Sequence, residues 1–198
     1  MVLRLLVLSL GLHGCASLGP RSVEGDPLAL GLKQFTLDGK VSWRQGDDSG
    51  RAALGWVQDG ARFRLVLTGP FGRGAAVLEG VAAAVTLTSG DRILEGPSAN
   101  ALLEAELGVP LPLEQAVYWV RGVPAPGPVR VQARDPAGWA SAIRQAGWDV
   151  AWPRRATIDG MALPARIELT RDDVRVLIVA GRWQPGVAVF DAQGGGGV

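Results

Sequence analysis

Residues 62–68 read RFRLVLT and contain the clearest alternation of apolar and polar positions in this 198-residue chain. The apolar residues Phe63, Leu65 and Leu67 occupy every second position, and an arginine stands on either side of Phe63. Successive side chains of a β-strand point to opposite faces, so the three apolar side chains would share one face. This pattern predicts a strand with one buried and one exposed face, which is typical of an antiparallel sheet.

Other short segments of the chain show similar alternation, and many are separated by turns that contain glycine. Alternating segments joined by such turns are typical of hairpins, so the chain predicts an antiparallel meander. Two acidic pairs, Asp47-Asp48 and Asp172-Asp173, are expected at hairpin tips. The predicted strands are residues 35–44, 52–56, 62–68, 75–79, 83–88, 92–95, 148–152, 167–170 and 174–182.

Two short helices are expected to interrupt the strands. The first follows Ser98, a residue type that caps helix N-termini, and ends at Gly108. The second begins near Pro112 and ends at Gly122, with apolar residues spaced three and four apart. We therefore predict a mainly β fold with short helices, in which a curved antiparallel sheet buries one face. The helices would cover that face and leave a cavity beneath them.

The N-terminal segment predicts export from the cytoplasm. Arg4 precedes an apolar run over residues 5–12, which is shorter than the roughly 20 apolar residues of a transmembrane helix. Such a segment is typical of a signal peptide. Leu12-His13-Gly14-Cys15 resembles the lipobox of bacterial lipoproteins, although His13 is an unusual residue there. The resemblance implies cleavage before Cys15 and a lipid on its thiol; the alternative is a secretory signal with an incidental cysteine.

These features divide the chain into four expected parts: a signal peptide (1–14), a lipidated N-terminus and linker (15–33), a folded domain (34–190) and a glycine-rich tail (191–198). The residues after the cysteine are Ala and Ser. In many Gram-negative lipoproteins Asp at that place retains the protein in the inner membrane, so the resemblance to lipoproteins implies the outer membrane here.

Processing at Cys15 would remove or block the residue types that most hydrolases and metal sites use. His13 is the single histidine and Cys15 the single cysteine, so the mature chain would have neither a histidine nor a free thiol. Ser-His-Asp and Cys-His catalysis and the usual His or Cys metal sites are therefore excluded. The net charge of +1 argues against nucleic acid as a partner. An exported hydrolase with two converging carboxylates stays as an alternative.

The aromatic composition favours an apolar interior. The chain has seven tryptophans and one tyrosine, and indole rings are broad and largely apolar. As a group they predict a wide aromatic-lined interior that would suit acyl chains. The alternative for each tryptophan is ordinary core packing.

Phe71 lies in a Gly-Pro-Phe-Gly turn, residues 69–72, between two predicted strands. Polar residues are expected at such a tip, so an exposed phenylalanine there would be a probe for a membrane or a partner. The alternative is that the ring folds back and closes the end of the sheet.

Several segments, taken in order, resemble one family. They are Phe35–Gly39, Trp56, Arg62–Leu65, Leu67–Gly72, Gly108–Pro112, Trp119 with Gly122 and Pro124, Gly147-Trp148, Leu163-Pro164 and Trp183. Together they are similar to the LolB family of outer-membrane lipoproteins, which receive other lipoproteins from the periplasmic carrier LolA. No single motif is specific, but the ordered set covers nearly all of the chain after Cys15. The resemblance implies an incomplete antiparallel β-barrel closed by helices around a hydrophobic cavity.

The resemblance also implies a function without catalysis and without a cofactor other than the lipid on Cys15. A monomeric, lipid-anchored protein facing the periplasm would accept acylated lipoproteins from a LolA-like carrier and insert them into the inner leaflet of the outer membrane. Pro70, Phe71 and Gly72 would form the membrane-insertion loop, with Phe71 where the family usually has leucine. The alternative is a structural outer-membrane assembly lipoprotein with a packed barrel and no cargo cavity. The residues expected to line the cavity are Trp56, Phe63, Leu65, Leu67, Trp119, Trp148 and Trp183.

Overall fold

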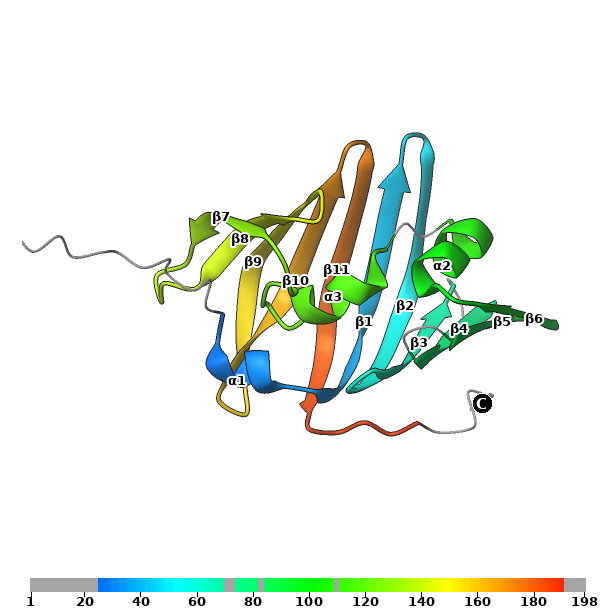
Figure 1. Ribbon diagram of the computed structural model, residues 1–198, viewed down its shortest axis with the longest axis horizontal. Helices are drawn as coiled ribbons and strands as arrows, with labels where there is room; N and C mark the ends of the chain where they lie inside the picture. The colour runs from blue at the N-terminus through cyan, green and yellow to red at the C-terminus, as the bar shows by residue number, and fades with distance from the viewer. Residues whose placement is uncertain (1–24, 70–73, 82–83, 109–110, 191–198) are drawn as a thin grey trace, which may run out of the picture.

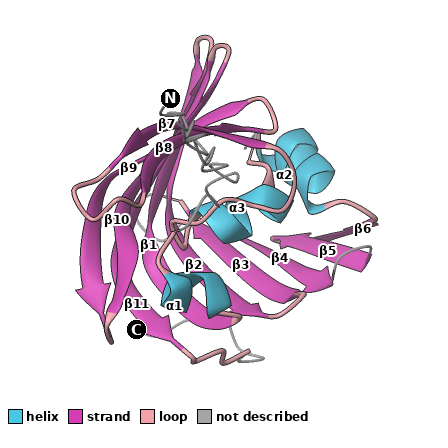
Figure 2. Ribbon diagram, turned by 60° about the vertical axis from the view of Figure 1, so that its left-hand side comes forward, coloured by secondary structure: helices cyan, strands magenta, loops and turns pink. Residues whose placement is uncertain are grey.

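The computed structural model describes residues 25–69, 74–81, 84–108 and 111–190 (Figure 1). These residues form one strongly curved sheet with short helices against its concave side (Figure 2). The predicted mainly β fold, an antiparallel barrel that is not fully closed, is confirmed.

Within the described residues, all eleven strands belong to one antiparallel sheet in the order β6-β5-β4-β3-β2-β1-β11-β10-β9-β8-β7. The chain builds two runs of hairpins, and the pairing of β1 with β11 joins them in the middle of the sheet. Strands β6 and β7 form the two edges, so the sheet stays open between them. The strands are β1 (Gln34–Gln45), β2 (Asp48–Asp59), β3 (Arg62–Thr68), β4 (Ala75–Val81), β5 (Ala84–Ser89), β6 (Arg92–Gly96), β7 (Val129–Arg134), β8 (Ala140–Gln145), β9 (Trp148–Ile158), β10 (Met161–Arg171) and β11 (Val174–Pro185).

Strand β3 has the alternation that the sequence predicts. Phe63, Leu65 and Leu67 are buried, and the residues between them are partly exposed. Leu65 lies opposite Trp56 of β2, and Leu67 lies opposite Leu54. Because directly opposite residues share one face of the sheet, these pairs build the apolar concave face.

The helices of the described part are α1 (Pro27–Gly31), α2 (Ala99–Leu107) and α3 (Leu113–Trp119). The predicted capping of α2 is confirmed: the Ser98 hydroxyl accepts a hydrogen bond from the Ala101 amide, and Gly108 is left-handed with φ of 60°. The Asn100 side chain accepts a bond of 2.7 Å from the Leu113 amide. That bond fixes the start of α3 to α2.

The β1–β11 pairing shifts register between Asp38 and Gly39, which is a β-bulge. A Cβ added to Gly39 would lie 2.3 Å from the carbonyl oxygen of Val179 on β11. Only glycine permits this approach of the two backbones, and bulges increase the local bend and twist of a sheet. Gly39 therefore helps to curve the sheet around its concave face.

One expected boundary is wrong. Residues 15–33 are predicted to be a linker, yet Pro27–Gly31 forms α1, and Ala29 and Leu32 belong to the apolar core. Asp26 caps this helix by accepting a bond from the Leu28 amide. A five-residue helix is too short to show a periodic pattern, so its one sequence signal is the start at Asp26-Pro27, an N-cap residue followed by proline in the first turn.

Strands β7 and β8 are also missing from the sequence prediction. Most residues of β7 are exposed because it is an edge strand, so it has little apolar alternation. The β7–β8 pairing contains register shifts, and the buried positions of β8 do not alternate regularly. Strands β9 and β10 run farther than predicted, because polar residues such as Arg154 and Arg155 occupy the added positions.

Some predictions concern residues outside the described ranges: the signal peptide (1–14), Cys15, the turn Pro70-Phe71-Gly72 and the tail (191–198). None of the helices in the described part is long and apolar enough to cross a membrane.

Replacing Gly39 with valine is expected to destabilise the domain by about 1–3 kcal/mol, because the new side chain meets backbone that cannot rotate away. Gly31→Val is the matched control, since a Cβ at Gly31 has no neighbour within 4 Å. Urea unfolding of the processed chain carrying Cys15→Ala measures both variants. Equal stability of Gly39→Val and the unsubstituted chain would show that the bulge does not need glycine.

Candidate functional site

The concave side of the sheet and the helices enclose one continuous apolar interior. The seven residues expected to line a cavity all belong to it, and none is more than 8% exposed. The structure thus brings together residues from β2, β3, α3, β9 and β11, which are distant in sequence. They are Trp56, Phe63, Leu65, Leu67, Trp119, Trp148 and Trp183.

Phe35 lies at the centre of the aromatic part of this interior. Its ring centroid is 6.0 Å from that of Trp56 and 5.3 Å from that of Trp183, in tilted and edge-on arrangements. Its side chain is fully buried, as is the neighbouring inward residue Leu37. The site prediction omitted Phe35, although its alternation with Leu37 in a predicted strand is the signal that marks it as inward-facing.

Four indole N–H groups of the interior have hydrogen-bond partners, those of Trp56, Trp119, Trp152 and Trp183. Trp56 donates to the Gln58 side chain at 2.9 Å, and Trp183 donates to the Pro164 carbonyl at 3.0 Å. Trp152 donates to the Trp119 carbonyl at 2.7 Å, which ties β9 to the end of α3. Because these four N–H groups are satisfied at the rim of their rings, the ring faces present apolar surface to the interior.

Gln145 is a buried polar residue that the sequence analysis did not identify. Its side-chain oxygen accepts bonds from the Trp119 indole at 2.9 Å and from the Ala125 amide at 2.8 Å. Its side-chain nitrogen donates to the Ala125 carbonyl at 2.7 Å. One amide therefore fixes α3 and the segment that follows it to the edge of the sheet.

Arg121 connects two of the covering helices. Its Nε donates to the Val117 carbonyl of α3 at 2.9 Å, and its Nη1 donates to the carbonyls of Leu30 and Leu32 at the end of α1. Its guanidinium also lies 4.8 Å from the centre of the Tyr118 ring. Burial lowers the pKa of Arg121, and the nearby Tyr118 acts in the opposite direction.

Within the described residues no carboxylate pairs with Arg121, so carbonyl oxygens and the face of the Tyr118 ring stabilise its charge. A buried cation held only by carbonyl groups costs desolvation free energy that an apolar contact would not. The contact between α1 and α3 is therefore specific in geometry but limited in strength.

Arg155 and Asp26 fasten the other side of the helical layer. Arg155 donates to the carbonyls of Ala140 at 2.8 Å and Gly122 at 3.3 Å, and burial lowers its pKa while Asp135 and Asp26 raise it. Asp26 accepts a bond of 2.6 Å from the Ala162 amide, so the start of α1 is fixed to β10. A Cβ at Gly122 would lie 2.2 Å from Arg155, which adds a packing reason to the helix-ending role predicted for that glycine.

The two acidic pairs lie at exposed hairpin ends, as predicted: Asp47-Asp48 between β1 and β2, and Asp172-Asp173 between β10 and β11. The described residues contain no group of three or more His, Cys, Asp or Glu side chains that could hold a metal ion. Apolar side chains fill the interior, so the seven residues expected to line a cavity are packed together in the described part of the chain. Such an interior can bind other apolar groups only where they replace part of this packing.

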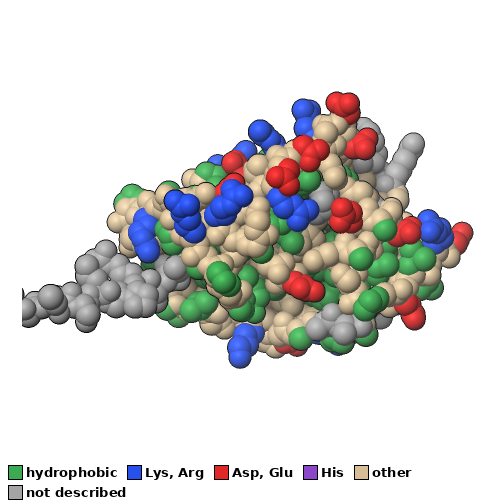
Figure 3. Space-filling view, turned by 45° about the horizontal axis from the view of Figure 1, so that its top comes forward, with side chains coloured by type: hydrophobic (Ala, Val, Ile, Leu, Met, Phe, Trp, Pro, Cys, Tyr) green, Lys and Arg blue, Asp and Glu red, His purple; other side chains and the backbone are tan. Residues whose placement is uncertain are grey.

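The exterior carries charges of both signs. On the face shown in Figure 3, lysine and arginine side chains gather mainly over one side of the molecule and acidic side chains over the other. The full chain has 20 basic and 19 acidic residues, so attraction to a charged partner would have to be local.

Comparison with known proteins places the chain among outer-membrane lipoproteins. A family model described as "Outer membrane lipoprotein LolB" matches residues 33–183. The outer-membrane lipoprotein LolB of Chromohalobacter salexigens is 37% identical over 189 residues, covering 90% of this chain and 88% of that protein. The LolB protein of Stutzerimonas stutzeri is 38% identical over 190 residues, covering 90% of this chain and 92% of that protein.

A solved structure has the same kind of fold at low sequence identity. The crystal structure of a DUF1329 family protein from Desulfovibrio piger matches with a TM-score of 0.53 and 8% identity, covering 83% of this chain and 90% of that chain. At this identity the likeness concerns the fold alone.

Replacing Arg121 with methionine tests whether this residue holds the helices together. The variant leaves the carbonyls of Leu30, Leu32 and Val117 without their donor, so we expect a loss of about 1–3 kcal/mol in the free energy of unfolding. We also expect faster proteolysis near α1. Arg130→Met, at an exposed position of β7, is the control for the charge change. If Arg121→Met is as stable and protease-resistant as that control, the contact does not hold α1 in place.

Proposed function

This chain belongs to the LolB family of outer-membrane lipoproteins, and we propose that it accepts acylated lipoproteins from a LolA-like periplasmic carrier and inserts them into the outer membrane. The family is one of lipid-anchored lipoproteins of the outer membrane that face the periplasm, not of enzymes. Its role is in lipoprotein targeting. The hand-off from a carrier, the interior as the cargo site and the lipid on Cys15 are the parts that this proposal adds.

The observation that supports the proposal best is the apolar interior beneath the helices. Trp56, Trp119 and Trp148 are at most 1% exposed there, and they come from the sheet and from a covering helix. These apolar side chains pack against one another in the structure, and the same surface would suit the acyl chains of a lipoprotein once a covering helix moves away.

The helical layer is suited to move. The helices α1, α2 and α3 have 5, 9 and 7 residues, and isolated helices of fewer than about 12 residues are marginal in water. Their position therefore depends on contacts with the sheet and with one another, such as the carbonyl-solvated Arg121. In the proposed mechanism these helices move away from the sheet and acyl chains take their place against the tryptophans.

Energetics favour direct transfer between two proteins. Each methylene that leaves an apolar site for water costs about 0.8 kcal/mol, so free acyl chains in the periplasm are strongly disfavoured. A hand-off between two apolar interiors avoids that state. With no nucleotide-binding motif in the sequence, the direction of transfer would follow the relative affinities of carrier, receiver and bilayer.

A structural role in the outer membrane is the second candidate function. It is favoured because side chains fill the interior of the structure. A structural outer-membrane assembly lipoprotein would need a packed barrel of this kind and no room for cargo. The two functions differ in whether the helices ever leave the sheet.

Transfer in solution separates the two functions. The processed chain with Cys15→Ala, mixed with an acylated lipoprotein bound to its carrier, is expected to take up the lipoprotein, as measured by co-purification. A variant of the same chain with Phe71→Glu should take up cargo equally well but deliver it poorly to phospholipid vesicles, because a charged tip enters a bilayer at high cost. Phe71→Leu is the control that keeps an apolar tip.

Cargo uptake and vesicle delivery test different parts of the proposal. Failure of the unsubstituted chain to take up cargo would favour the structural role over transfer. Normal delivery by Phe71→Glu would show that the Pro70-Phe71-Gly72 turn is not the insertion loop, whether or not cargo is accepted.

A further inference from the structure

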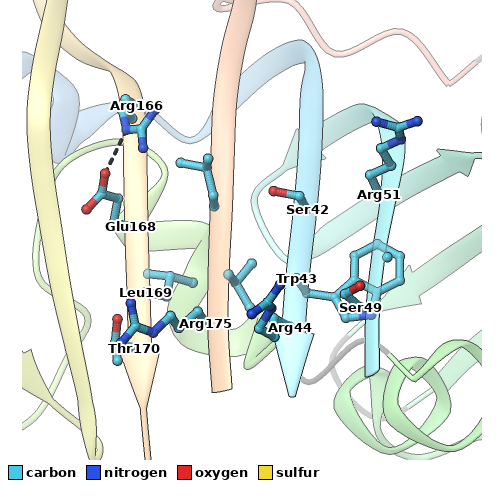
Figure 4. Close-up of a pocket in the computed structure, with 13 residues that line it drawn as sticks. Ser42, Trp43, Arg44, Ser49, Arg51, Arg166, Glu168, Leu169, Thr170 and Arg175 are labelled. Atoms are coloured by element: carbon cyan, nitrogen blue, oxygen red, sulfur yellow. Dashed lines mark hydrogen bonds and ion pairs between the residues drawn. The ribbon is translucent and has the colours of Figure 1, made fainter. Parts of the chain in front are cut away.

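The outer, convex face of the sheet carries a row of four polar side chains across β10, β11, β1 and β2. Arg44 lies directly opposite Arg175 on one side and Ser49 on the other, and Arg175 lies opposite Thr170. Figure 4 shows the four side by side, with the two arginines in the middle. Both arginines are exposed, on the face opposite to the core residues Val41 and Val176 of the same strands.

The pairing of Arg44 with Arg175 lowers the stability of the sheet. Like charges directly opposite each other on neighbouring antiparallel strands destabilise the sheet. Among the described residues neither Arg44 nor Arg175 forms an ion pair, and the same holds for Arg51 in the next row. Two guanidinium groups flanked by two hydroxyls instead make a set of donors for one anion with several oxygen atoms, such as a phosphate.

The row lies in a broad groove of ≈ 980 Å³ that also includes Arg51, Arg166 and Glu168. Arg166 and Glu168 form a 2.7 Å ion pair and neutralise each other. The acidic hairpin residues Asp47, Asp48, Asp172 and Asp173 lie beyond the row, at the ends of the strands. They would repel an acidic protein face that runs past the tips, so the anion that suits this row is one small enough to contact the arginines alone, such as a headgroup phosphate.

The groove leads toward the predicted insertion loop. A second hollow of ≈ 750 Å³ shares Ser42 and Arg51 with the first and extends past Lys40 to Thr68 and Gly69. Gly69 immediately precedes Pro70 in the sequence. A basic groove and the root of an apolar turn therefore lie on one surface.

We propose that this groove binds phosphate headgroups of the receiving bilayer, with Arg44 and Arg175 as the central ligands. The inference rests on the proposed function, because that function gives the Phe71 turn its membrane target. Headgroup binding places the convex face against the bilayer surface while cargo occupies the concave side. The domain would then be oriented by its own sheet as well as by its lipid anchor.

Vesicle binding tests the proposal. The processed chain with Cys15→Ala is sedimented with vesicles of phosphatidylethanolamine and phosphatidylglycerol, with and without Arg44→Gln/Arg175→Gln. We expect the double variant to bind roughly 30-fold more weakly, since each arginine near an anionic bilayer strengthens binding about fivefold. Lys33→Gln/Arg130→Gln makes the same charge change at two exposed positions away from the groove and should bind nearly as well as the unsubstituted chain.

Urea unfolding and cargo uptake are measured on the same variants. Urea unfolding should find the double variant at least as stable as the unsubstituted chain, because its like-charge pair is gone. Equal vesicle binding by the double variant and its control overturns the proposal. Loss of cargo uptake from the carrier without vesicles also overturns it, since the groove would then dock the carrier. If the unsubstituted chain takes up no cargo but the arginine effect on vesicles persists, the proposed function fails and the headgroup site stands.

Discussion

The structure depends on covering the apolar concave face of a single open sheet. No second sheet packs on that face in the described residues, so the helices and the segments that flank them separate it from water. Burying apolar surface stabilises the fold, and exposing it costs free energy in proportion to its area. Two features of the fold are consistent with this requirement. The bulge at Gly39 helps the sheet to curve around its apolar face, and the helices that cover the face are short enough to fit within the curve.

The way in which the helices are held connects this requirement to function. Polar contacts at a few points, made by Arg121, Gln145 and Asp26, position a layer whose helices are too short to be stable alone. In the proposed function this layer is exchanged for the acyl chains of a cargo lipoprotein without unfolding the sheet, because the sheet's own hydrogen bonds are made between strands. Such a transfer would need no chemical energy, only a difference in how well each successive site covers the same chains.

The sequence was sufficient to predict the strands with strong alternation, such as β3, and the caps of α2 at Ser98 and Gly108, because those signals are local. It was insufficient for α1, which is too short for a period, and for β7, an edge strand without a buried face. The seven residues predicted to line a cavity do face inward, since aromatic and alternating apolar residues mark the inward face, and their role in holding cargo stays a prediction. The sequence did not predict the roles of Arg121, Gln145 or the Arg44–Arg175 pair. Their contacts depend on strand register and on partners distant in the chain.

The central claim is that cargo acyl chains occupy the space between the helices and the concave face. Photocrosslinking from a benzophenone amino acid tests it most directly, placed at Trp56 on the inner face or at the neighbouring Val57 on the outer face of the same strand. After uptake of a lipoprotein with labelled acyl chains, the account predicts label crosslinked from position 56 and little or none from position 57. Equal crosslinking from both positions, or crosslinking from 57 alone, would contradict it.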